Sequence, residues 1–380
     1  MNTGAAQTLN LDRAERRALV AGAAGLAACL AGGILSPAQL LRSYLVGYLF
    51  WIAIALGSLA LVMLHHMVGG NWGYVIRRQL EAATGTLPLM AVLSLPLLGG
   101  VHQLYPWSHP GHISASKALY LNVPFFAART AVYFGVWIGL AFLLNRLSLE
   151  QDRTGEPAIV RRLQVLSGPG LLVYGLTVSF ASVDWVMSLE PHWFSTIYGV
   201  LFMVGQALTT LAFAVTALML LSRREPLAEV LTPGHFHDLG NLMLAFVMLW
   251  AYVAVSQFLI IWSANLPEEI PWYLARLEGG WGGIALLLVL FHFAVPFLLL
   301  LVRRVKRRMR VIAALAVAMM AMRLVDLFWI VAPAFHPGRL RVHWLDLAAP
   351  AAIGGLWIWF FLRRLKSRPL LPLHDPRFST

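Results

Sequence analysis

The sequence is poor in charged residues. Only 12% of its 380 residues are Asp, Glu, Lys or Arg, about half the share found in a soluble domain. Hydrophobic residues make up 59%, and the mean hydropathy is +0.72. No polar stretch is long enough to cover a soluble core, so most of the surface is expected to face lipid.

Cysteine is almost absent, which excludes several kinds of redox site. Cys29, in an apolar run, is the only one. An intrachain disulfide, a four-cysteine iron–sulfur cluster and a CxxCH haem attachment site are therefore impossible within this chain. The sequence also lacks a Walker motif, a GxSxG elbow and an HExxH motif. Nucleophilic or metal-assisted chemistry by this chain alone is not expected.

What the sequence has in abundance is long apolar runs. A membrane-spanning helix needs roughly 20 apolar residues, and ten such runs occur. We therefore predict an all-α integral membrane protein with about ten transmembrane helices. The predicted spans lie near residues 18–35, 43–64, 87–105, 122–144, 168–189, 194–222, 239–262, 279–302, 308–331 and 343–362. The first apolar run lacks a small-residue cleavage site, so it is interpreted as a retained helix.

The basic residues predict the orientation. Of the 29 Lys and Arg residues, 22 lie in the N-terminal segment 1–17, in alternate connections and in the tail 363–380. By the positive-inside rule these parts are cytoplasmic, so both termini are expected there. The net charge of +12 and the pI near 10.4 then indicate contact with phospholipid headgroups, not with nucleic acid.

The connections on the other side are rich in Pro, Trp and His: PWSHPGH at 106–112, EPHW at 190–193, NLPEEIPW at 265–272 and FHPGRLRVHW at 335–344. Most of their tryptophans are expected to be interfacial anchors. These are Trp107, Trp193, Trp272 and Trp344.

Ionisable and polar residues inside the spans are functional candidates, because a charge in the membrane is costly. Arg323 and Asp326 share a helix face by their i, i+3 spacing, and Arg129 and Asp184 lie in the outer halves of their spans. The further candidates are Ser256, Gln257 and His292. Two interpretations stay open: the charges pair off to let helices pack, or they form a polar pocket or proton relay that opens outward.

A second, looser group lies on the predicted inner side. Its members are His65, His66, Glu81, His235, His237 and Asp238. Imidazoles at a membrane edge can pass protons near neutral pH, but ordinary interfacial histidines are the favoured interpretation. A b-type haem is not expected, because only His292 is deep in a span. A carrier with broken helices is disfavoured because the spans read as mostly continuous, with Pro296 the clearest interior break.

Several strings resemble one family. DWVMSLEPHWFSTIYG at 184–199 is similar to the signature of the ActF-type membrane subunit of alternative complex III, an NrfD-like polytopic family. Further similar strings are HHMVGGNWGYVIRRQLEAATGTLPLM at 65–90, KALYLNVPFFAAR at 117–129, GHFHDLGNLMLAF at 234–246 and IWSANLPEEIPWY at 261–273. The resemblance covers roughly residues 40–362.

The resemblance implies a bacterial quinol:electron-acceptor oxidoreductase in the cytoplasmic (inner) membrane. The resemblance also implies a fold of two four-helix bundles, near 43–189 and 194–331, within a membrane domain of residues 18–362. The implied partners are a sister multi-span quinol-binding subunit, an iron–sulfur subunit, haem c subunits and small membrane subunits. Quinone or menaquinone is the implied ligand, and haem c and iron–sulfur clusters belong to the partners. The motif residues carried over are Asp184, Glu190, His192, Arg129, His65, His66 and Asp238.

We therefore expect a membrane subunit without a redox centre of its own, which supports quinol oxidation or conducts protons. A structural scaffold that docks the sister subunit is the first alternative. A secondary transporter is the second.

Overall fold

The computed structural model describes residues 11–375 and confirms the all-α prediction, with no strand among the described residues. Ten helical segments are long and apolar enough to cross a membrane. They are Asp12–Leu35, Pro37–Val68, Asn71–Gly99, Val123–Thr154, Ala158–Leu189, Tyr198–Leu221, Pro233–Ala264, Trp281–Leu301, Met309–Ala334 and Leu345–Lys366.

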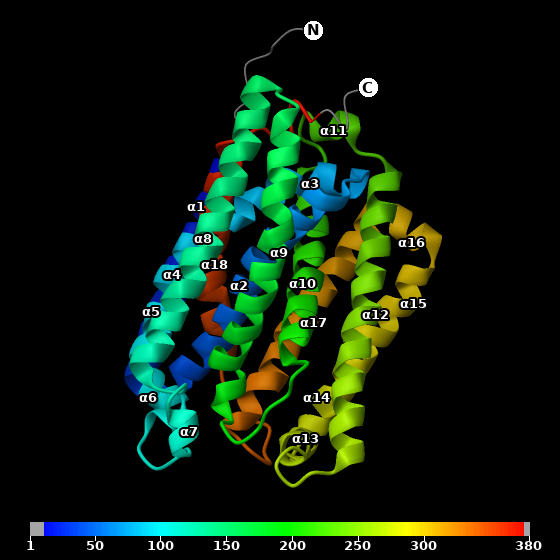
Figure 1. Cartoon of the computed structure of the whole chain (residues 1–380). Helices are drawn as coiled ribbons and strands as arrows, with labels where there is room; N and C mark the ends of the chain where they lie inside the picture. The colour runs from blue at the N-terminus through cyan, green and yellow to red at the C-terminus, as the bar shows by residue number, and fades with distance from the viewer. Residues whose placement is uncertain (1–10, 376–380) are drawn as a thin grey trace.

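The segments run roughly parallel to one axis, and the two described chain ends lie at the same end of the molecule (Figure 1). We call this the basic end, because it also carries the short helix α16 (Arg303–Arg307) with its block of cations. The other end carries the short helices α6 (Val101–Leu104) and α13 (Pro271–Leu277). We call it the opposite end. Because the number of spans is even, both described ends lie at the same end of the molecule.

The helices form two groups of four plus a peripheral pair. In the first group, α2 (Pro37–Val68), α8 (Val123–Thr154) and α9 (Ala158–Trp185) pack with the third span. The second group joins α10 (Tyr198–Leu221), α12 (Pro233–Ala264), the eighth span and α17 (Met309–Val331). The groups meet chiefly where α10 packs on α2 and α9. This arrangement matches the expected two bundles.

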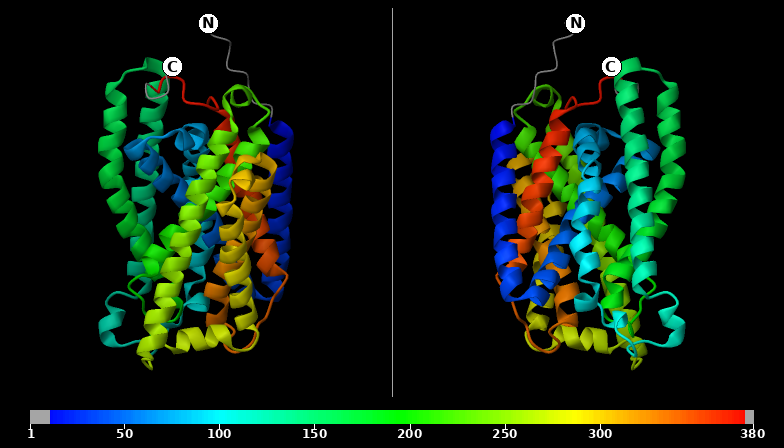
Figure 2. Two further views of the ribbon diagram at one scale, coloured as in Figure 1. Left: turned by 90° about the vertical axis from the view of Figure 1, so that its right-hand side faces the viewer. Right: turned by 90° about the vertical axis from the view of Figure 1, so that its left-hand side faces the viewer.

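Helices α1 (Asp12–Leu35) and α18 (Leu345–Lys366) form the peripheral pair, which flanks α2 (Figure 2). Small residues let their backbones approach closely, as in many membrane helix pairs. A Cβ placed on Gly25 would lie 2.7 Å from the Cα of Ala352, and one on Gly22 would lie 2.8 Å from the backbone nitrogen of Leu356. The Ala- and Gly-rich first span is therefore held by backbone contact more than by large side chains.

The third span corrects the expectation of mostly continuous helices. It is divided into α3 (Asn71–Thr84), α4 (Leu87–Leu93), α5 (Leu95–Gly99) and α6. Pro88 and Pro96 each sit in the first turn of a new segment, because proline lacks the N–H that a continuous helix needs. The expected break at Pro296 is confirmed: α14 (Trp281–Leu288) passes through a π-helical turn, Val289–Ala294, into α15 (Val295–Leu301).

The connection after the fourth span is also different from the prediction. Helix α8 continues to Thr154 and α9 begins at Ala158, so residues expected in a loop are helical. The turn uses Gly155 with φ of 65°, a left-handed conformation that suits glycine. At 32 residues, α8 is about 48 Å long. The hairpin of α8 and α9 reaches beyond α3 and α16 at the basic end (Figure 1).

The predicted tryptophan anchors are largely wrong. Trp107, Trp193 and Trp272 are buried within the protein, and only Trp344 is exposed. Trp193 and Trp272 stack with ring centroids 4.6 Å apart, which ties the connection after α9 to α13. Three of the four tryptophans thus fix their connections to the protein core, while most other residues of these connections are exposed or half-buried.

Candidate functional site

Arg129 and Asp184 form a two-pronged ion pair inside the first bundle. Nε and Nη2 of Arg129 donate to the two carboxylate oxygens of Asp184 at 2.9 and 2.8 Å. The hydroxyl of Tyr133 donates to the same carboxylate at 2.7 Å. Asp184 is fully buried. Its negative charge is therefore neutralised and its oxygens are occupied by donors from α8.

The arginine side of this pair is equally well supported. Its Nη1 donates to the carbonyl oxygen of Tyr120 at 2.8 Å, and its guanidinium lies 3.8 Å from the centroid of the Tyr120 ring. Burial, together with the charge of Asp184, raises the pKa of Tyr120 to about 12. The pairing interpretation of Arg129 and Asp184 is confirmed in geometry.

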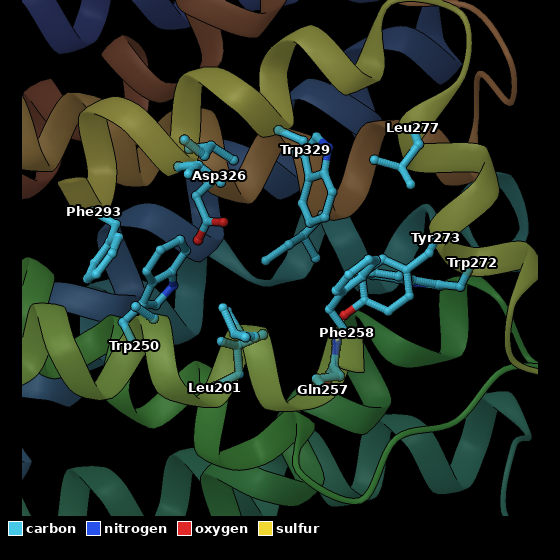
Figure 3. Close-up of a pocket in the computed structure, with 17 residues that line it drawn as sticks. Leu201, Trp250, Gln257, Phe258, Trp272, Tyr273, Leu277, Phe293, Asp326 and Trp329 are labelled. Atoms are coloured by element: carbon cyan, nitrogen blue, oxygen red, sulfur yellow. Dashed lines mark hydrogen bonds between the residues drawn. The ribbon is translucent and has the colours of Figure 1, made fainter. Parts of the chain in front are cut away.

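The second bundle holds an apolar cavity that opens between its helices. Its volume is about 370 Å³, within the range of small-molecule sites. Figure 3 shows Trp250, Phe293, Trp329 and Phe258 around it. Aromatic and aliphatic side chains therefore form nearly all of its wall, and the few polar groups that reach it stand out.

Asp326 is the one carboxylate in this wall. It points toward the cavity beside the indole of Trp250 (Figure 3). Nη1 of Arg323 donates to its Oδ2. This confirms the pairing expected from the i, i+3 spacing. The guanidinium of Arg323 packs against Gly205 of α10, where a Cβ would lie 2.5 Å from its Cζ.

A neutral polar pair stands in another part of the wall. The carboxamide of Gln257 donates through Nε2 to the hydroxyl oxygen of Tyr273 at 3.2 Å, and it accepts from the hydroxyl of Ser195 at 2.9 Å. Burial raises the pKa of Tyr273 to about 12, so its phenol is protonated at neutral pH. Ser256, the neighbouring candidate, is half-buried and does not line the cavity.

The cavity reaches the lipid-facing surface between α12 and the eighth span. Two of its lining residues, Val255 and Val289, are 60% and 55% exposed. Both lie in the apolar parts of segments that can cross a membrane. A ligand could therefore enter from the hydrocarbon side without passing through water.

His292 lies in the π-helical turn of the eighth span and is completely buried. Its ring packs edge-on against Trp250 with centroids 4.5 Å apart. Neither ring nitrogen has a hydrogen-bond partner among the described residues. Single π turns in helices are frequent at functional sites. Here the turn sets His292 behind the cavity wall and not in it.

At the opposite end, Glu190 and Arg276 join the two bundles. Nη2 of Arg276 donates to the carboxylate of Glu190 at 2.6 Å and to the carbonyl oxygen of Ile330 at 2.7 Å. The guanidinium stacks on Trp272 at 3.6 Å. Arg276, counted only as a charge of the outer connections, is thus a buried link. His192, by contrast, is exposed.

The basic end contains a buried ion network that the sequence did not reveal. Glu81 accepts hydrogen bonds from Arg77 at 2.9 Å, from Arg78 at 2.6 Å and from the hydroxyl of Ser148 at 2.6 Å. All three charged side chains are about 1% exposed or less. Further members come from α8 and from the segment after α18: Gln151, Asp152, Asn145, Arg368 and Asp375.

This network corrects the description of Arg77, Arg78 and Glu81 as part of a connection, since all three lie within α3. When basic residues are counted for the positive-inside rule, each one is treated as a solvated charge, so buried arginines are not recognised. The signal available in the sequence was the pairing of RR with a Glu three and four residues later.

The structure brings together only some members of the group predicted on the inner side. His65 and His66 are buried near the end of α2, with ring centroids 6.0 Å apart. His235 forms a capping box with Thr232 at the start of α12, which explains its position in structural terms. Asp238 lies half-buried on the next turn of α12.

The two ion pairs, Arg129–Asp184 and Arg323–Asp326, stay separate. Between the bundles lies a small void of about 10 Å³ lined by Ser182, Gln206 and Arg323, which is about the size of one water. Within residues 11–375, no group of three or more His, Cys, Asp or Glu side chains is placed to hold a metal ion. No family model matches the chain, and no curated protein matches it.

Proposed function

We propose that the chain is a membrane subunit of a bacterial quinol:electron-acceptor oxidoreductase of the alternative complex III kind, and that the cavity of the second bundle receives the quinol ring. The observation that carries the proposal is one cavity with three properties. It is apolar, it opens toward lipid at Val255 and Val289, and it presents one buried carboxylate, Asp326.

The chemistry of a quinol fits these properties. Its ring is flat and apolar and carries two hydroxyl groups on opposite sides, and its long tail stays in the bilayer. Aromatic walls suit the ring, and Asp326 is a hydrogen-bond acceptor for one hydroxyl. Gln257 and Tyr273 offer polar partners for the other. The opening between α12 and the eighth span would leave the tail in lipid.

Oxidation of a quinol releases two electrons and two protons. We assign the electrons to iron–sulfur and haem c centres of partner subunits. Asp326, five residues before the end of α17 at Val331, lies about 8 Å from that end by helical rise. It would therefore take up a proton near the opposite end of the molecule.

The distribution of basic residues supports the placement in the bacterial inner membrane with the basic end in the cytoplasm. The block Arg303–Arg307, the α8–α9 hairpin and both described chain ends share that end. Under the positive-inside rule the opposite end then faces outward. The protons would leave on that side.

The first test is a gentle purification of the tagged chain from its own membranes. We expect haem c absorbance in reduced-minus-oxidised spectra, with iron–sulfur and sister membrane subunits in the eluate. A colourless protein recovered alone, under conditions that preserve other respiratory complexes, would overturn the assignment to this class of complex.

The second test addresses the cavity. Val255→Trp fills its lipid opening and should lower quinol-dependent turnover several-fold. Leu259→Trp, one turn further along α12, is 59% exposed outside the cavity and serves as the matched control. Asp326→Asn should also reduce turnover while the complex still assembles. Full turnover in assembled Val255→Trp and Asp326→Asn complexes would refute the cavity assignment.

A structural scaffold is the second candidate, and the first bundle favours it. Asp184 already receives three donors, and the charges of the basic-end network are matched within the protein. Groups saturated in this way hold helices together and offer no site for a ligand. Unchanged turnover in all assembled variants would make this the preferred function.

A further inference from the structure

We propose that the basic end carries a specific binding site for an anionic phospholipid, formed where α1 meets the connection after α10. A hollow of about 440 Å³ lies there, lined by Arg13, Arg17 and Arg224 together with Leu11 and Ala14. Three guanidinium groups from two separate segments thus share one concave surface. Neither the cavity of the second bundle nor any residue of the proposed quinol site takes part.

The three arginines are available to an external anion. Each is exposed, and none makes an ion pair with a described residue. The acidic residues of the first turn of α1, Asp12 and Glu15, are engaged by Lys366 of α18 instead. The first ten residues of the chain contain no acidic side chain. Within residues 11–375, no ion pair therefore neutralises the positive charge of the hollow.

Their position matches the headgroup level of a bilayer. Arg13 and Arg17 are four residues apart and share one face of α1, just before its apolar part. Val20, which follows on α1, is 62% exposed, and Leu220, one turn before Arg224, is 70% exposed. Apolar side chains on both segments thus continue directly below the cations. Acyl chains would lie against this apolar surface while the phosphate meets the guanidinium groups.

This combination distinguishes a phospholipid from a soluble anion. Guanidinium groups bind phosphate oxygens through paired hydrogen bonds, which explains the arginines but not the apolar surface beside them. A basic pocket next to membrane helices on the cytoplasmic side is a recurrent headgroup site. Glu225 and Glu229 occur in the connection after α10 but do not line the hollow.

The test is a titration of the purified full-length chain with tetraoleoyl cardiolipin, followed by native mass spectrometry. The triple variant Arg13→Gln/Arg17→Gln/Arg224→Gln should bind cardiolipin about a hundredfold more weakly. Each basic residue near the surface contributes ~1 kcal/mol to the binding of an anionic lipid, and 1.4 kcal/mol corresponds to about a tenfold change in affinity. The control Arg303→Gln/Arg304→Gln/Arg307→Gln removes the same charge from exposed residues of α16 at the same end. It should bind within a few-fold of the wild type.

Equal losses in the two triple variants would show general surface attraction and overturn the proposal. Displacement of cardiolipin by inorganic phosphate at equal concentration would assign the hollow to a soluble anion and overturn it as well. If the triple variant does not fold, a second measurement on the wild type still tests the site. Glyoxal labelling of Arg13, Arg17 and Arg224 should slow in nanodiscs containing cardiolipin relative to phosphatidylcholine alone, and an unchanged labelling rate would refute the site.

Discussion

We expect Arg129 and Asp184 to stabilise the fold only as a pair, and either residue without the other to destabilise it. Asp184→Leu leaves the guanidinium of Arg129 with the Tyr120 carbonyl and the rings of Tyr120 and Phe125 as its described partners. Arg129→Leu leaves a fully buried carboxylate with only the Tyr133 hydroxyl. Breaking a buried pair from either side costs about 3–5 kcal/mol of unfolding free energy. We expect each single variant to lose that amount.

The double variant Arg129→Leu/Asp184→Leu should be more stable than either single variant. It removes both charges, so neither is left buried without its partner, and replacing a buried pair by apolar residues is often close to neutral. The interaction energy from the double-mutant cycle should therefore be several kcal/mol, well above the error of about 0.5 kcal/mol for independent sites. Tyr133→Phe, which removes one hydrogen bond to the charged group, should cost about 1.5–3 kcal/mol.

The assay is equilibrium unfolding of the four proteins in one detergent, followed by quinol-dependent turnover of the purified complexes. Additive single effects, or single variants within about 1 kcal/mol of the wild type, would refute the reasoning, because breaking a buried ion pair leaves the remaining charge without its partner at a larger cost. Turnover then separates the two roles. A stable double variant with full turnover makes the pair purely structural, and a stable but inactive one assigns it to proton movement.

Three further predictions follow from other parts of the fold. Glu81→Gln, at the centre of the basic-end network, should lower the unfolding free energy by about 3–5 kcal/mol, whereas Glu150→Gln, whose only described ion pair is 3.8 Å long and partly exposed, should change it by about 0.5 kcal/mol or less. Gly25→Leu should separate α1 from α18 and speed maleimide labelling of the buried Cys29; Ala→Leu at the exposed position 24 is the control, and equal rates would contradict the packing. Burial lowers the pKa of His336, with Arg42 and Arg341 adding to the effect. The unfolded chain then binds more protons below pH ~6.5, so the melting temperature should fall as the pH drops through 6.5, and His336→Gln should reduce that slope.

The arrangement of spans could be predicted because hydrophobic length is a strong local signal. Even the Ala- and Gly-rich first span was identified, although its packing on α18 depends on backbone contacts that hydropathy does not measure. Helix ends were less accurate. The hairpin of α8 and α9 continues through polar residues that an apolar window excludes, and Pro88 divides the third span within an apolar run.

The candidate site was predictable only in part. Arg323 and Asp326 share one helix face, so their pairing follows from spacing, and Arg129 and Asp184 were two further charges of opposite sign inside the predicted spans. The cavity was not predictable, because its walls are Trp, Phe, Leu and Val, which a sequence cannot distinguish from lipid-facing residues. The basic-end network was missed for the opposite reason, since its arginines resemble ordinary solvated charges.

The two intramembrane carboxylates show how far geometry can separate residues that composition treats alike. Asp184 is fully buried and accepts hydrogen bonds on both oxygens, from an arginine and a tyrosine. Asp326 takes an arginine hydrogen bond on one oxygen and faces a cavity large enough for a small aromatic molecule. A carboxylate that must exchange a proton with a ligand needs such an open side. If one of the two takes part in quinol chemistry, it is therefore Asp326, and substitution of Asp184 should affect stability before it affects catalysis.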